Sequence, residues 1–165
     1  MAINKFFIII FCFTLVIVDA QKNIDQVLRK YKNDEGVINM NFTGEILKMI
    51  NSTEKKLKSQ VEIVDVLVFQ KSKDIDSQDK NDIQKVLTRD KFDLLVDVKI
   101  KTQKVKLYAL DAGEYLNKVY AQVNTEDMNA YFILSGRIVF EELAKLGMDF
   151  QSGDALKILD SAKKK

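Results

Sequence analysis

The side chains of this 165-residue chain that could do chemistry are carboxylates, lysines and tyrosines, since histidine is absent and Cys12 is the one cysteine. Without histidine there is no Ser-His-Asp triad, no Cys-His dyad and no histidine-ligated zinc or haem site. A general base would have to be a carboxylate, a lysine or a tyrosine. We therefore expect no catalysis, no cofactor and no tightly bound transition metal.

One carboxylate is distinguished by its surroundings. Asp65 lies in the middle of the apolar run VEIVDVLVF, residues 61–69. If it faced a cleft, Glu62 or Asp97 could complete a glycosidase-like pair, and the protein would be a carboxylate-dependent hydrolase. The alternative interpretation is an aspartate at a strand edge or sheet end that is bonded to a turn or to a lysine.

Tyrosines and basic residues alternate with apolar residues along the second half of the chain, so they fall on one face of the predicted strands. Such a face could stack on sugars or hold an anionic partner through charge and cation–π contacts. It could also be a solvated face stabilised by cross-strand pairs. The candidate interaction surface for a protein or glycan partner consists of Tyr108, Tyr120, Tyr131, Lys99, Lys106, Lys118 and Arg137.

Other motifs are lacking. No glycine-rich phosphate loop has the required spacing, and Asp74-Ile75-Asp76 lacks the glycine and the distal glutamate of a calcium loop. The 26 basic and 24 acidic residues nearly balance, which argues against a nucleic-acid partner. Gly113, Gly136 and Gly147 are predicted to be turn or cap glycines.

The elements that must position these residues begin with a helix capped by Asn23, with Gln26 completing a capping box. A strand is predicted over residues 37–42, followed by a short helix capped by Thr43. Residues 61–69 predict a strand covered on both faces. A helix that begins at Asp76 or Ser77 places its apolar residues inward, namely Ile83, Val86 and Leu87.

From residue 92 the hydrophobic period is two, which predicts four consecutive antiparallel strands at 92–100, 105–109, 118–123 and 130–137. The first hairpin turns at Thr102-Gln103. A helix follows from Val139 to Gly147, and Leu156 and Leu159 mark a weaker amphipathic stretch. The fold class is α+β: a twisted, mainly antiparallel sheet of about five or six strands with helices packed on one face.

The first twenty residues, MAINKFFIIIFCFTLVIVDA, have the pattern of a secretory signal peptide, with Lys5 before an apolar run and Ala20 before the expected cleavage site. Residues 21–165 would then be a single exported domain, periplasmic or extracellular, with no stable membrane span. Phe11 precedes Cys12 where a lipoprotein needs small residues, so lipid anchoring is not expected. Cleavage leaves no cysteine for a disulfide.

Two segments resemble a known family. DEGVINMNFTGEILKMI (34–50) and YFILSGRIVFEELAKL (131–146) are similar to the opening and closing signatures of the domain of unknown function 4252 family. The similarity runs from about Lys30 to Met148. The resemblance implies secreted or lipid-anchored proteins of Bacteroidetes-type bacteria, an envelope location, no assigned enzymatic activity and no catalytic residues.

These observations favour a non-enzymatic exported protein that binds a partner in the cell envelope through its tyrosine- and lysine-bearing sheet face. Two alternatives stay open at this point. One is the carboxylate-dependent hydrolase built on Asp65, and the other is a regulatory component of envelope signalling.

Overall fold

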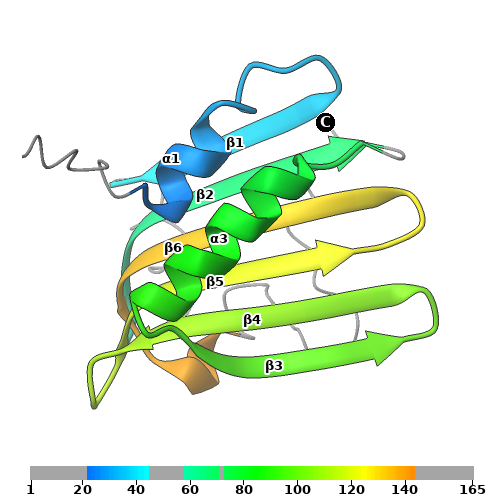
Figure 1. Cartoon of the computed structure of the whole chain (residues 1–165). Coiled ribbons are helices and arrows are strands. Elements are labelled where there is room, and N and C mark those ends of the chain that lie inside the picture. Colours follow the sequence, from blue (N-terminus) through cyan, green and yellow to red (C-terminus); the bar gives the residue numbers. More distant parts are fainter. Residues whose placement is uncertain (1–21, 45–57, 71–72, 144–165) are drawn as a thin grey trace, which may run out of the picture.

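Six strands form one open antiparallel sheet in the computed structural model, which describes residues 22–44, 58–70 and 73–143 (Figure 1). The spatial order of the strands is β1-β2-β6-β5-β4-β3. Their bounds are β1 Val37–Thr43, β2 Gln60–Gln70, β3 Asp93–Ile100, β4 Gln103–Asp111, β5 Leu116–Asn124 and β6 Met128–Ile138. The expected antiparallel sheet of about five or six strands is therefore confirmed, and it has six.

Strands β3 to β6 form a meander, in which each strand pairs with the next along the chain. The first hairpin turns at Lys101-Thr102, one residue earlier than predicted, and Gln103 already pairs with Ile100. Strand β2 pairs with β6, so the last strand lies inside the sheet, between β2 and β5. This arrangement leaves β1 and β3 as the two edge strands.

Two helices are described, α1 (Ile24–Arg29) and α3 (Ser77–Arg89). The predicted capping box of α1 is present: Gln26 donates its backbone N–H to the Asn23 side chain, and the Gln26 side chain accepts from the Asn23 backbone. Helix α3 begins directly after Asp76, as predicted, and buries Ile83, Val86 and Leu87. Both helices pack on the same face of the sheet, and α3 crosses it obliquely (Figure 1).

The two faces of the sheet carry separate apolar cores. The helix-covered face buries side chains such as Leu67 and Phe69 of β2 against α1 and α3. The opposite face buries the alternate residues, among them Val66, Val119 and Phe132. As predicted for residues 61–69, β2 is covered on both faces, because Val64, Val66 and Val68 are buried together with Leu67 and Phe69.

The chain differs from expectation after β6. The helix predicted from Val139 is, over its described part, a short 3₁₀ turn at Phe140–Glu142, with Leu143 buried behind it. The helix predicted after Thr43, the end of the Val139 helix, the stretch around Leu156 and the signal segment all fall outside the described residues. The described residues therefore do not decide whether helices cover one face alone. In this part of the chain, no helix has the length and hydropathy to cross a bilayer.

Gly136 is not the turn or cap glycine that the sequence suggested. It lies within β6 with φ +134°, opposite a bulge of β2 between Val61 and Ile63. A Cβ at this position would lie 2.3 Å from the carbonyl oxygen of Gln60 and 2.9 Å from the backbone nitrogen of Glu62. The glycine is needed because the bulged backbone of β2 passes directly against it.

Candidate functional site

A row of aromatic rings crosses the sheet beneath α3. Register pairs Tyr108 of β4 with Tyr120 of β5, and their ring centroids are 6.1 Å apart. Tyr120 stacks on Tyr131 of β6 at 6.4 Å, and Tyr131 meets Phe69 of β2 edge-on at 5.7 Å. Tyr31, two residues after the end of α1, closes the row against Phe69 at 5.5 Å. The rings stabilise one another and the helix–sheet contact.

The solvent-exposed tyrosine face expected from the alternation is wrong. Tyr108, Tyr120 and Tyr131 expose 8%, 2% and 1% of their surface. Period-two alternation separates two faces, but it does not say which one is covered, and here both are buried. Tyrosine suits a covered face because its ring packs as a hydrophobic group while its hydroxyl finds a polar partner.

A groove between α3 and strands β4 and β5 is the candidate site; we call it the lysine groove. Its volume is about 210 Å³. The aromatic row forms its floor, and lysines and amides form its rim. The polar residues that line it are Lys80, Gln84, Lys104, Lys106, Gln122 and Asn124, with the tyrosines 108, 120 and 131 below. None of the described residues that line it is acidic.

Tyr120 is one of the residues that line the lysine groove. Every fully buried polar side-chain atom of the described residues has a hydrogen-bond partner. No described group bonds to the Tyr120 hydroxyl, so this hydroxyl is not among the fully buried polar atoms. Burial raises the pKa of Tyr120, helped by the neighbouring Tyr108 and Asp74, so this hydroxyl stays protonated and can donate to a ligand.

The Tyr131 hydroxyl is bonded to a residue of the loop that precedes α3. It donates to the carboxylate of Asp74, which also accepts from the backbone N–H of Ile75 at 2.8 Å and pairs with Lys80 at 2.5 Å. Burial, followed by this bond to Asp74, raises the pKa of Tyr131. The loop before α3 is thereby fixed to the sheet at the edge of the lysine groove.

The seven residues predicted as an interaction surface do not all meet, and Lys99, on β3 opposite Lys104, does not line the groove. Tyr108, Tyr120, Tyr131 and Lys106 surround the lysine groove. Lys118 instead forms an ion pair with Asp25 of α1. Arg137 is exposed and lies with its guanidinium 4.9 Å from the Tyr115 ring centre, 3.9 Å from Glu114. Lys118 and Arg137 therefore lie outside the lysine groove.

The carboxylate pair suggested for a hydrolase is not assembled around Asp65. Asp97 lies on β3, four strand spacings from β2, or about 19 Å, whereas glycosidase carboxyls lie about 5–10 Å apart. Asp65 accepts from Lys32 at 2.9 Å and from the Asn41 amide at 2.6 Å, and Glu62 is exposed. The cavity beside Asp65 measures about 10 Å³, room for at most one water molecule.

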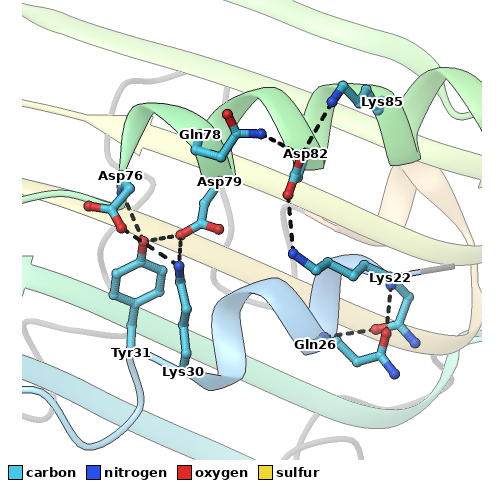
Figure 2. Close-up of polar contacts among 10 residues, drawn as sticks. Lys22, Gln26, Lys30, Tyr31, Asp76, Gln78, Asp79, Asp82 and Lys85 are labelled. Carbon is cyan, nitrogen blue, oxygen red and sulfur yellow. Dashed lines mark hydrogen bonds and ion pairs between the residues drawn. The ribbon is translucent and has the colours of Figure 1, made fainter. Parts of the chain in front are cut away.

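A buried polar cluster joins α1 to α3, and Figure 2 shows its geometry. Asp79, 5% exposed, accepts from the Tyr31 hydroxyl and pairs with Lys30. The Tyr31 hydroxyl in turn accepts from the backbone N–H of Asp76 at 2.8 Å. At the other end of α1, Lys22 lies 3.4 Å from Asp82. The two helices are thus connected by polar contacts at both ends of α1.

The cluster perturbs the ionisation of its members. Burial and the bond to Asp79 raise the pKa of Tyr31 to about 12. The bond to Asp79 also raises the pKa of Lys30 above its ordinary value. Lys30 is therefore charged and Tyr31 neutral at physiological pH, and the cluster holds the two helices together.

One feature of the sequence indicates this cluster, but the periodicity of α3 alone does not identify the residues that contact it. Asp79, Ile83 and Val86 fall at i, i+4 and i+7, so an acidic residue occupies the apolar stripe of α3. A buried aspartate needs a cation or donors. Lys30 and Tyr31 supply them from a segment 48 residues away, which no local pattern identifies.

A second hollow lies at the far end of the β3–β4 hairpin and is acidic. Its volume is about 390 Å³, and four carboxylates line it: Asp93, Asp111, Glu114 and Glu141. Leu95 and Phe140, both 40% exposed, add apolar surface. Within the described part of the chain, no group of acidic residues has the geometry to hold a metal ion.

A family model described as "Domain of unknown function (DUF4252)" matches residues 31–146, a range that contains all six strands, α3 and every residue of the lysine groove. No curated protein and no solved structure matches the chain. The matched range covers well over half of the sequence and begins and ends close to the two signature segments. The chain therefore belongs to the DUF4252 family.

Proposed function

We propose that this protein is an exported, non-enzymatic binding module of the cell envelope and that its ligand lies over the lysine groove. The observation that carries the proposal is the composition of this groove. Lys80, Lys104 and Lys106 line this groove together with Tyr120, and no described acidic residue lines the space. A concave site with a few convergent polar groups on an apolar floor is the usual form of a binding pocket.

The non-enzymatic part of the proposal is supported by the side chains available. The chain has no histidine, and the carboxylate singled out in the sequence is engaged by Lys32 and Asn41. The titratable groups of the groove are lysines and tyrosines. Such groups bind and orient a ligand, and no described residue that lines the groove is a serine, threonine or cysteine nucleophile.

Export is supported by the N-terminal sequence. Lys5, the apolar run that follows and Ala20 match a signal peptide, and the resemblance to secreted proteins points the same way. The partner would then be met in the envelope or outside the cell.

The experiment is site-specific photo-crosslinking in the native cells. A photoreactive amino acid replaces Lys104 at the groove, and in a matched control it replaces Lys91, another exposed lysine, beyond the end of α3. We expect a discrete crosslinked species in the envelope fraction from position 104 and none from position 91. The absence of any species at 104, or the same species at both positions, would contradict a binding site at the groove.

A further inference from the structure

Lys104 on the rim of the lysine groove and Lys99 beside it have no acidic partner among the described residues. Lys99 of β3 and Lys104 of β4 lie directly opposite each other in the antiparallel register. Both are exposed, and no described carboxylate lies within ion-pair distance of either one. Like charges directly opposite in a sheet are destabilising. The fold therefore keeps an unfavourable pair at this place, and an anion bound between the two lysines would relieve it.

The neighbouring lysines are neutralised within the chain. Lys106 lies 3.4 Å from Asp97 on β3, and Lys80 lies 2.5 Å from Asp74. The positive charge of this surface is thus concentrated on Lys99 and Lys104. Helix α3 crosses the sheet obliquely and leaves the hairpin end of β3 and β4 uncovered on this side (Figure 1).

Resting on the function proposed above, we infer that the ligand is an acidic, extended segment of a protein partner. One carboxylate side chain enters the lysine groove, and another lies over Lys99 and Lys104. Same-face residues of a strand, such as Lys104 and Lys106, repeat at about 6.8 Å, and acidic side chains at alternate positions of an extended peptide repeat at the same distance.

The size of the lysine groove favours a side chain over a whole small molecule. Its volume of about 210 Å³ is below the roughly 300–1,000 Å³ of sites that enclose a drug-sized ligand. A groove of this size admits one side chain from a partner that remains outside it. The amides of Gln84, Gln122 and Asn124 stand on its rim, where a peptide backbone can bond to them.

The burial of the tyrosines argues against a glycan. Sugar recognition by stacking needs an exposed ring face. The rings of Tyr108, Tyr120 and Tyr131 expose 8%, 2% and 1% and are packed against one another. The aromatic row therefore offers a ligand no open ring face, whereas a phenol hydroxyl such as that of Tyr120 can donate to a carboxylate.

The test measures binding of a short fluorescent peptide of alternating glutamate and serine to the purified exported protein. The same peptide with glutamine in place of glutamate, polygalacturonate and inorganic phosphate are measured in parallel. The variant is Lys99→Gln with Lys104→Gln. The matched control is Lys85→Gln with Lys91→Gln, which removes the same charge from exposed sites on the far side of α3 and beyond its end.

We expect the acidic peptide to bind with a salt-dependent affinity and the glutamine peptide not to bind. Loss of the two lysines should weaken binding roughly 3- to 30-fold, and the control pair should change it by less than about 2-fold. The Lys99/Lys104 variant should also unfold at an equal or higher urea concentration, because the like-charge pair is gone. This second readout shows that the variant is folded.

Equal peptide binding by the variant and the wild type would overturn the inference, as would binding of polygalacturonate or phosphate with no binding of the acidic peptide. In either case, a species crosslinked from position 104 in cells would leave the binding function standing with another ligand. Failure of that crosslinking would instead remove the binding function itself.

Discussion

At the scale of single residues, the side chains that fix this structure are a few polar groups placed among apolar ones. Asp79 holds both Lys30 and Tyr31, and Asp74 holds both Lys80 and Tyr131. In each case a carboxylate of the α3 region bonds to a tyrosine of the aromatic row. Because Asp79 is buried and Asp74 half-buried, each carboxylate needs such partners, and these bonds fix where α3 lies on the sheet.

The pKa of Tyr31 predicts how stability changes at alkaline pH. The phenol titrates near 10 in the unfolded chain and near 12 in the folded protein. Its contribution is therefore complete below pH 10 and is lost as the pH rises from about 10 to 12. The raised pKa of Lys30 acts in the same direction. The wild-type free energy of unfolding should fall over this range, by about 1–3 kcal/mol from Tyr31.

Tyr31→Phe keeps the ring against Phe69 but removes the hydroxyl. The variant should be less stable than the wild type at pH 7, and the two free energies of unfolding should converge toward pH 12. Urea unfolding at a series of pH values measures both. Two curves that stay parallel from pH 8 to 12 would show that the Tyr31–Asp79 bond does not contribute in this way.

At the scale of the elements, periodicity predicted the strands and α3 well because each of them satisfies a local rule. Alternation at residues 92–100 and the apolar stripe of Ile83, Val86 and Leu87 are complete within one element. The pairing of β6 with β2 is not local, and neither is the choice of which face α3 covers. For this reason the sequence predicts the strand of each tyrosine and the face that the three share. It does not predict that this face is buried in the core.

The candidate site was predictable to a similar extent. Alternation placed Tyr108, Tyr120, Tyr131 and Lys106 on a common face, and the structure brings all four to the lysine groove. Lys104 and Lys80 were missed, the first because it sits beside a predicted turn, the second because it comes from α3. Lys118 could not be separated from the groove by sequence, because its ion pair with Asp25 joins β5 to α1.

Gly136 gives a test of the β2–β6 packing. Gly136→Ala should reduce the free energy of unfolding by roughly 3 kcal/mol or more, because the new Cβ meets the backbone of β2 and the left-handed φ is strained. Gly113→Ala is the control, since Gly113 has φ +92° and no heavy atom within 4 Å of its Cβ position. Its cost should be roughly 1–2 kcal/mol.

Both variants can be compared by urea unfolding, where a changed midpoint at constant slope reports stability. Similar midpoints for the two variants would mean that backbone conformation alone, and not the close approach of β2, requires glycine at position 136.

At the scale of the whole molecule, a near-zero net charge conceals a separation of charge along one hairpin. Lysines gather at the turn of β3 and β4, and carboxylates line the hollow at the other end of these strands. Composition alone excluded a strongly basic protein, but it could not reveal this local patch. Because of this separation of charge, the turn end of the β3–β4 hairpin is cationic and can attract an acidic partner at low salt.

The proposed export makes a prediction about the N-terminus. In native cells the accumulated protein should begin at Gln21, which N-terminal sequencing or intact mass determines. Lys5 is the only charged side chain before the apolar run, so a Lys5→Glu change should slow processing. Protein that keeps Met1 and stays with the membrane fraction would contradict a cleaved signal peptide.

The most direct measurement of the central claim is an NMR titration of the lysine side chains with the alternating glutamate–serine peptide. We predict that the Nζ resonances of Lys99 and Lys104 shift together and saturate with one affinity, while those of Lys85 and Lys91 stay in place. Shifts of equal size at all four lysines, or no saturable shift at Lys99 and Lys104, would contradict a binding site at the lysine groove.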